Sequence, residues 1–505
     1  MQNNDIGITE ARPMPAPGDV VPATVEQAQS IGGAVRKGVL WTSLSRVVVQ
    51  LLQVGVTVAL ARLLAPADFG AVTIVTSITG FAALFVELGL VSALVQRNSV
   101  DETVLSTAFW LNAVLGVVLA VPVVALAPVA AALFDTPSLV YLMPVASLTF
   151  VLSLSVVQSA TLRRALDFKR LARIGIVNAV ANAVVAVACA AAGLGALSIV
   201  LGTVAATLVS TIQSWCYVPW RPKVRPTRQA LRELWSYTRG LVGFGSVNYW
   251  SRNADNLLIG GFLGTTALGY YGRAYNLMLM PVSQLNAVLN SVLFSTLSRL
   301  QADEQRFRRA WLLSAKASFM AGAPIGIGMS VTAPALVETF FGARWLPMAP
   351  VLALLAASVP PQLIGSATGS VFQAKAKNDL QFRLGLITSC ITVAAILGAL
   401  PFGIVAVAAA LLVKSWTSVL IPLIPTLRLA GISFLNFLRA ISWTGMSTVA
   451  MGAAAWAAGH ALRASSPPLV LGVQVATGVI VYGALIIARE RPFIRELRGA
   501  RKRKP

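Results

Sequence analysis

Long apolar segments recur along almost the whole chain, separated by short stretches that carry charges, prolines or glycines. An α-helix needs about 20 mostly apolar residues to cross the hydrocarbon core of a bilayer, and a helix satisfies its own backbone polar groups where no water is available. The pattern therefore predicts fourteen membrane-spanning helices, over residues 39–61, 70–95, 105–127, 139–161, 171–192, 195–218, 238–263, 269–294, 312–334, 348–372, 383–400, 402–425, 438–462 and 468–488.

The composition supports a membrane protein and argues against a soluble one. Of the 505 residues, 56% are hydrophobic and only 11% are charged, whereas about a quarter of an ordinary soluble chain is charged. We therefore predict an all-α polytopic membrane protein, located in the bacterial cytoplasmic (inner) membrane.

The net charge of +22 would suggest a nucleic-acid partner in a soluble chain. Here most Lys and Arg residues collect in short loops on one predicted side, as the positive-inside bias of membrane insertion describes, so we expect no nucleic acid to bind. The other side keeps only Arg62, Arg273, Arg344 and Arg463. This separation favours an even number of spans with both termini in the cytoplasm.

An internal repeat divides the chain. At an offset of 199 residues, Leu60–Gly70 aligns with Ile259–Gly269, and at an offset of 210 Arg173 aligns with Arg383 and Gly175 with Gly385. Both copies would begin with a span leaving the cytoplasm, so the repeats are parallel and related by an axis along the membrane normal. We expect two six-helix lobes around a central cleft, which is where such transporters place their substrate, plus two C-terminal helices.

The predicted organisation follows from these spans. It comprises a disordered cytoplasmic tail (1–35), an N-lobe (36–220), a basic cytoplasmic linker (221–237), a C-lobe (238–427), the last two spans (428–488) and a basic cytoplasmic tail (489–505). The three cysteines lie in or beside apolar segments without the spacing of a metal site. We expect no metal site, no cofactor and no catalytic residue.

Four segments carry a resemblance to a known family: GVLWTSL from Gly38, ARLLAPADFG from Ala61, FVELGL from Phe85 and ADNLLIGGFLG from Ala254. With residues 36–430, the chain resembles the polysaccharide transporter family of the multidrug, oligosaccharidyl-lipid and polysaccharide (MOP) exporter superfamily, especially its Wzx-like flippases. The resemblance implies alternating access, which would move undecaprenyl-pyrophosphate-linked oligosaccharide repeat units to the outer leaflet for exopolysaccharide, capsule or O-antigen (lipopolysaccharide) synthesis. It further implies coupling to a Na⁺ or H⁺ gradient, with membrane lipids and a polysaccharide polymerase or export complex as partners.

Charged residues inside the predicted spans are the candidate site residues, because a charge near the bilayer centre costs about 2.5–3.5 kcal/mol on insertion scales. Arg46, Arg252 and Lys414 are candidates for binding the pyrophosphate in the central cavity, since a guanidinium fork suits paired anionic oxygens. Structural alternatives stay open: Arg46 as a snorkelling side chain, Arg252 in an intrahelical pair with Asp255, and Lys414 capped by carbonyls.

Two further pairs of residues are weaker candidates. Asp255 and Glu87 are candidates for coupling an ion, although Glu87 also suits a helix-end contact. Arg62 and Arg273 lie at or near the outer ends of their spans, where they would either receive the head group or mark the membrane interface.

Other functions are weighed on the same residues. An enzyme is disfavoured because the short outer loops hold no clustered carboxylates, and an ATP-driven pump because the chain has no GxxxxGK phosphate loop. A drug or cation antiporter of the same superfamily would favour acidic cavity residues, whereas the buried set here is net positive. A lipid II flippase would share that basic cavity and stays an alternative.

Overall fold

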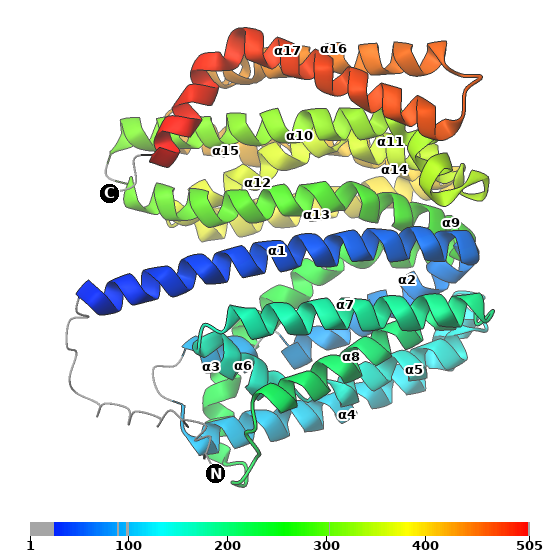
Figure 1. The fold of residues 1–505 in the computed structure, drawn as a ribbon, viewed down its shortest axis with the longest axis vertical. Helices are drawn as coiled ribbons and strands as arrows, with labels where there is room; N and C mark the ends of the chain where they lie inside the picture. Colours follow the sequence, from blue (N-terminus) through cyan, green and yellow to red (C-terminus); the bar gives the residue numbers. More distant parts are fainter. Residues whose placement is uncertain (1–24, 88–89, 97–99, 302, 503–505) are drawn as a thin grey trace, which may run out of the picture.

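In the computed structural model of the chain, the described residues are 25–87, 90–96, 100–301 and 303–502; along parts of the first, the longest and the last helix only the backbone is described. Every described regular element is a helix (Figure 1). In order they are α1 (Val25–Leu63), α2 (Pro66–Glu87), α3 (Leu90–Gln96), α4 (Glu102–Leu133), α5 (Leu139–Leu152), α6 (Val156–Arg164), α7 (Phe168–Ala191), α8 (Leu197–Tyr217), α9 (Arg228–Arg299), α10 (Glu304–Phe341), η1 (Ala343–Trp345), α11 (Met348–Ala357), α12 (Val359–Ala374), α13 (Asn378–Ala399), η2 (Leu400–Phe402), α14 (Ile404–Ser418), α15 (Leu420–Leu429), α16 (Phe434–Ala461) and α17 (Pro467–Lys502).

The predicted spans coincide with these helices. Within the described residues, nine helices are long and apolar enough to cross a membrane, and eleven spans result if the bent pairs α5–α6 and α11–α12 each make one. The remaining three predicted spans fall on α16 and on the two arms of α9, which meet at Gly264 with a positive φ of 80°. The all-helical polytopic fold is confirmed, and the count of fourteen stays a prediction.

The break between α5 and α6, which bend by 48°, has an identifiable cause. Side chains of neighbouring helices donate to three carbonyls at the break: Asn112 Nδ2 to Ser153 O at 2.7 Å, Thr211 Oγ1 to Leu152 O at 2.7 Å, and Trp215 Nε1 to Leu154 O at 2.8 Å. Carbonyls freed from a helix inside a membrane need such partners. The sequence pattern predicted one continuous span here, because it does not show these long-range bonds.

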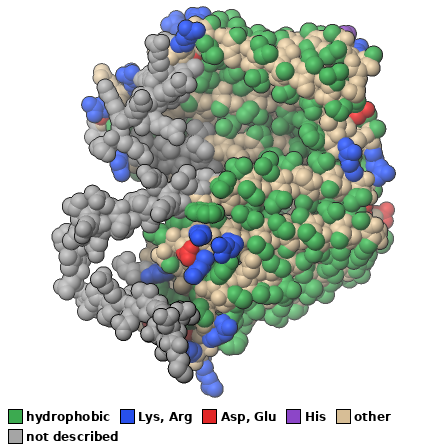
Figure 2. All heavy atoms as spheres, viewed as in Figure 1, with side chains coloured by type: hydrophobic (Ala, Val, Ile, Leu, Met, Phe, Trp, Pro, Cys, Tyr) green, Lys and Arg blue, Asp and Glu red, His purple; other side chains and the backbone are tan. Residues whose placement is uncertain are grey.

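The two ends of the helix bundle are named here after α1, which runs from the Arg46 end to the Arg62 end. The start of α1 and the end of α17 lie at the same end in Figure 1, as an even number of crossings requires. Hydrophobic side chains cover the middle of the helices on the face in Figure 2, and Lys and Arg lie toward the helix ends. This distribution matches a protein embedded in a bilayer.

A reciprocal contact joins the two lobes at the Arg62 end. A Cβ at Gly70 would overlap the carbonyl oxygen of Thr265, and a Cβ at Gly269 would overlap that of Pro66. The offset of 199 residues relates Gly70 to Gly269 and also Pro66 to Thr265. Each copy of the repeat therefore makes the same contact with the other, as a two-fold axis between them demands.

The Arg62 end is also closed by an aromatic cluster. Trp345, fully buried, donates from Nε1 to the carbonyl of Ala61 at 2.8 Å, and its ring meets that of Phe69 edge-on at 5.2 Å. Arg62 donates to the carbonyls of Thr339 at 2.9 Å and Phe340 at 3.4 Å. These contacts join α1 and α2 to α10 and η1, so the lobes are sealed together at this end.

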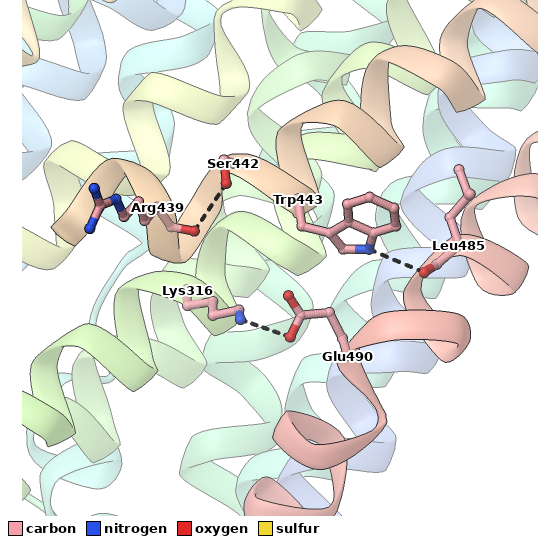
Figure 3. Close-up of polar contacts among 6 residues, drawn as sticks. All are labelled: Lys316, Arg439, Ser442, Trp443, Leu485 and Glu490. Carbon is pink, nitrogen blue, oxygen red and sulfur yellow. Dashed lines mark hydrogen bonds and ion pairs between the residues drawn. The ribbon is translucent and has the colours of Figure 1, made fainter. Parts of the chain in front are cut away.

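The last two helices pack on each other and on α10. Lys316 of α10 forms an ion pair with Glu490 of α17 at 2.7 Å, and Trp443 of α16 donates to the carbonyl of Leu485 at 3.2 Å (Figure 3). Tyr482 donates to the carbonyl of Met320 at 2.6 Å. The pair α16–α17 is thus attached to the C-lobe by polar contacts as well as apolar ones.

Some predicted boundaries differ from the helices. Residues 1–24 of the predicted tail lie outside the described residues, but α1 already begins at Val25. Likewise α9 begins at Arg228, inside the predicted linker, and α17 continues to Lys502 through most of the predicted basic tail. Lys, Arg, Glu and Ala are good helix formers, so charge ends an apolar span without ending the helix.

Candidate functional site

A cavity of about 660 Å³ lies between the lobes, bordered chiefly by α1, α7 and α9. Its polar lining is rich in amides and hydroxyls: Gln50, Gln53, Thr57, Asn178, Asn182, Thr203, Asn276 and Ser283. Such side chains are costly inside a membrane and mark substrate paths there. The predicted cleft between the lobes therefore exists as a polar cavity.

Arg273 is the charged residue of this lining. Its Nε is buried without a hydrogen-bond partner, and the guanidinium carbon lies 4.7 Å from the centre of the Phe69 ring. Among the described residues no carboxylate forms an ion pair with it. An unneutralised guanidinium facing a polar cavity is suited to bind an anion, because it presents N–H donors in a fork that matches phosphate.

Arg46 lines a neighbouring cavity of about 460 Å³. The two cavities share Val49, Gln50, Gly175 and Ser283 in their linings, so they form one recess that widens from Arg46 toward Arg273. Gln284 donates to Gln50 across this recess at 3.3 Å, joining α9 to α1. The side chain of Arg46 is exposed, which fits its predicted position facing the cleft at the accessible end.

Arg273 differs from its predicted placement. It was grouped with Arg62 as an outer-side residue, yet it lies about 13 Å along the helix axis from Gly264 at a rise of 1.5 Å per residue and lines the cavity. Arg62 does lie at the outer seal, bonded to two α10 carbonyls. The sequence missed this difference because it does not reveal that the arms of α9 meet at Gly264.

The other candidates lie elsewhere. Lys414, half-buried on α14, lines none of these cavities. Arg252 lies in the first arm of α9 and Glu87 ends α2, but both side chains lie outside the described part. The predicted intrahelical pair of Arg252 with Asp255 therefore stays a prediction.

Asp255 is buried and takes part in a contact within α9. Its Oδ2 accepts a hydrogen bond of 2.8 Å from the Tyr271 hydroxyl, and its Oδ1 accepts one of 2.9 Å from the Asn256 backbone. Tyr271 belongs to the other arm of α9, beyond Gly264. Asp255 thus ties the two arms together and does not line the cavities.

The amides of the cavity were missed in the sequence, where only charges were considered. A signal was present: Gln50 and Gln53 are three residues apart and Asn178 and Asn182 four apart, spacings that place each pair on one helix face. Amides repeated on one face of an otherwise apolar span indicate a polar surface inside the membrane.

Comparison with known proteins agrees with this geometry. Residues 59–350, more than half of the chain, match the family described as "Polysaccharide biosynthesis protein". The chain belongs to this polysaccharide biosynthesis family. It is 27% identical to the teichuronic acid biosynthesis protein TuaB of Bacillus subtilis, covering 70% of this chain and 74% of that one. It is 25% identical to the lipopolysaccharide biosynthesis protein WzxC of Escherichia coli, covering 71% and 74%.

Solved structures show the same fold. The lipid II flippase MurJ in an inward closed conformation superimposes with a TM-score of 0.72 at 14% identity, covering 91% of this chain and 99% of that one. An inward-facing multidrug resistance transporter of the MATE family, in the MOP superfamily, gives 0.58 at 16% identity, covering 76% and 95%. The predicted family, superfamily and fold are confirmed, and this member of the polysaccharide biosynthesis family is a membrane transporter of the flippase type rather than an enzyme.

Proposed function

We propose that this protein carries an oligosaccharide linked to undecaprenyl pyrophosphate from the inner to the outer leaflet of the bacterial cytoplasmic membrane, for exopolysaccharide, capsule or O-antigen synthesis. The observation that carries the proposal is the unpaired guanidinium of Arg273 in the polar cavity between the lobes. Arg273 would bind the pyrophosphate inside, and Arg46 would meet it at the mouth of the recess. The names of the relatives TuaB and WzxC support a role in making surface polysaccharide.

Alternating access fits the way in which the lobes meet. We assign the Arg46 end to the cytoplasm because the basic loops collect there, so both termini would be cytoplasmic. The Arg62 end, sealed by Trp345 and by the reciprocal glycine contacts, would then face outward. Rocking the lobes about this contact would close the Arg46 end and open the other.

Energy coupling is the least constrained part of the proposal. A gradient of Na⁺ or H⁺ would drive the cycle, and Asp255 is the acidic candidate whose side chain is described. Since Asp255 bonds Tyr271 across the α9 arms, ion binding there would loosen or tighten the hairpin that contacts α2. A polymerase or export complex would use the delivered repeat unit.

Two alternatives are tested by the same experiment. A lipid II flippase shares the fold, through MurJ, and would also need a cationic cavity. A cation antiporter shares the fold through the MATE transporter, but a cavity whose charged residue is an arginine disfavours a cationic substrate.

The test deletes the gene in its host and restores wild type, Arg273→Ala or, as a matched control, Arg463→Ala in the exposed turn between α16 and α17. Surface polysaccharide and undecaprenyl-linked intermediates are then quantified at equal protein levels. We expect loss of polymer and accumulation of intermediates in the deletion and in Arg273→Ala, with rescue by the control. Unchanged polysaccharide with impaired cell-wall synthesis would favour lipid II, and sensitivity to cationic drugs would favour the antiporter.

A further inference from the structure

A second cavity, of about 800 Å³, lies on the C-lobe side between α9, α12 and α13; we call it the C-lobe cavity. None of its lining residues is charged, and its polar groups are amides and hydroxyls, chiefly Asn286, Ser366, Ser370, Gln373, Gln381 and Thr388. It shares Leu279 and Ser283 with the cavity that holds Arg273. A ligand bound at Arg273 can therefore extend into the C-lobe cavity without leaving the protein.

The repeat shows that this cavity is the counterpart of the Arg46–Arg273 recess. Gly175 of α7 lines that recess, and its equivalent at the offset of 210, Gly385 of α13, lines the C-lobe cavity. At both glycines a Cβ would meet no atom within 4 Å, so both helices leave open space at the same position. The two lobes thus line equivalent cavities, of which one carries arginines and the other only uncharged polar groups.

The amides of the C-lobe cavity are available to a ligand. Ser366 donates to Asn286 Oδ1 at 2.6 Å, which leaves the Asn286 NH₂ group without a partner among the described residues. The side-chain amides of Gln373 and Gln381 likewise form no hydrogen bond with described residues. An amide both donates and accepts hydrogen bonds, as a sugar hydroxyl does, and the absence of charge disfavours an ionic ligand.

We propose that the C-lobe cavity binds the uncharged sugars of the lipid-linked substrate while its pyrophosphate is held by the arginines of the other recess. This inference rests on the proposed function and adds a division of the site: one lobe recognises the anion common to all such lipids, and the other reads the glycan. Selection among glycans would then depend on the residues of α12 and α13, because a site built from hydrogen-bonding groups discriminates against ligands that leave them unpaired.

The experiment uses the full chain in lipid nanodiscs and two probes. One probe is undecaprenyl pyrophosphate without sugar, and the other is the undecaprenyl-linked repeat unit extracted from the host. Gly385→Trp would fill the C-lobe cavity without a backbone clash, and Gln381→Leu would remove an amide without filling the space. Gly398→Trp is the matched control, since Gly398 lies on the same helix, has equally open space at its Cβ and is not part of the lining.

We expect wild type to bind the sugar-bearing lipid more tightly than the bare pyrophosphate. Gly385→Trp should weaken binding of the sugar-bearing lipid about tenfold, the equivalent of one or two lost hydrogen bonds, while binding of the bare pyrophosphate and the behaviour of Gly398→Trp stay unchanged. Gln381→Leu should act in the same direction with a smaller effect, and it provides the test if Gly385→Trp does not fold.

Two results would overturn the inference. One is equal binding of the sugar-bearing lipid by wild type and both cavity variants, and the other is an equal loss for the two probes, which would mean that the cavity does not read the sugar. Arg273→Ala separates this from the proposed function: it should weaken both probes, and if it weakens neither, the pyrophosphate site itself is wrong.

Discussion

Two buried cations show how this protein treats charge inside a membrane. Lys316, at the junction of α10 and α17, has its counter-charge within the chain, since Glu490 lies 2.7 Å away (Figure 3). Arg273, in the cavity between the lobes, has a buried Nε without a partner and forms no ion pair with a described carboxylate. A charge that is neutralised inside the protein attaches one helix to another, whereas one left without a counter-charge is available to an anion from outside.

The difference has an energetic consequence. An unpaired charge costs about 2.5–3.5 kcal/mol near the bilayer centre, so folding alone gives no reason to retain Arg273. Breaking a buried pair by removing one partner is itself destabilising, because it leaves an uncompensated charge. Substitutions at the two positions should therefore have opposite effects on stability and on transport.

The largest expected effect is that of Arg273→Ala on transport. Losing two or more charge-assisted hydrogen bonds to the pyrophosphate, at about 1.5–3 kcal/mol each, should slow flipping at least about 100-fold. Thermal unfolding in detergent should be unchanged or shifted upward, since a buried unpaired cation is removed. Arg273→Lys should fall in between, because an ammonium keeps the charge and loses the fork. A variant that unfolds early and still flips the lipid would contradict the contrast with Lys316.

The next largest effect concerns the pair itself. Lys316→Met or Glu490→Leu alone should lower the free energy of unfolding by roughly 3–5 kcal/mol, the range measured when one partner of a buried pair is removed. The double variant should recover most of that loss, because apolar side chains of similar volume replace the pair. Chemical unfolding in detergent checks the cycle, and flipping per folded molecule should stay near wild type in all three variants.

The sequence predicted much of this fold because the relevant signals are local. Apolar runs located the helices, and the offset of 199 residues paired Gly70 with Gly269, which make the reciprocal contact at the Arg62 end. Arg46 was expected to face the cleft, and it lines the recess.

The rest depends on contacts between distant residues. Lys316 and Glu490 are 174 positions apart, and Glu490 falls in a segment that was predicted to be a tail. Asp255 meets Tyr271 only because α9 folds back at Gly264. The C-lobe cavity has no charged residue to attract attention in an apolar chain, so it is recognised only when α12 and α13 are seen together.

A smaller effect tests whether the cavity of Arg273 is reached from both ends while the Lys316 pair stays enclosed. Gly70→Ala would place a methyl group against the Thr265 carbonyl, and overpacking of this kind costs about 1–3 kcal/mol. The seal at the Arg62 end should open about tenfold more often, and Gly269→Ala should match it because the two contacts are equivalent.

Cysteine labelling measures that opening in a background without the three native cysteines. A cysteine at Asn276, in the cavity, should react faster with a membrane-impermeant maleimide added on the outer side. A cysteine at Ser318, buried on α10 near Lys316, should stay protected. Gly55→Ala is the control, because its Cβ would meet nothing within 4 Å. Faster labelling at both sites would mean general loosening rather than opening of the seal.

The smallest expected effect is that of Arg62→Ala. Arg62 donates to the carbonyls of Thr339 and Phe340 at the end of α10, where a cation also favours the negative end of the helix dipole. Its side chain is exposed, so water replaces much of what is lost, and labelling at Asn276 should rise only two- to threefold, in line with a contribution of about 0.5 kcal/mol. Arg62→Lys should restore most of the protection by keeping the charge. An effect as large as that of Arg273→Ala on transport would mean that Arg62 also handles the anion, and the distinction between a sealing and a binding arginine would fail.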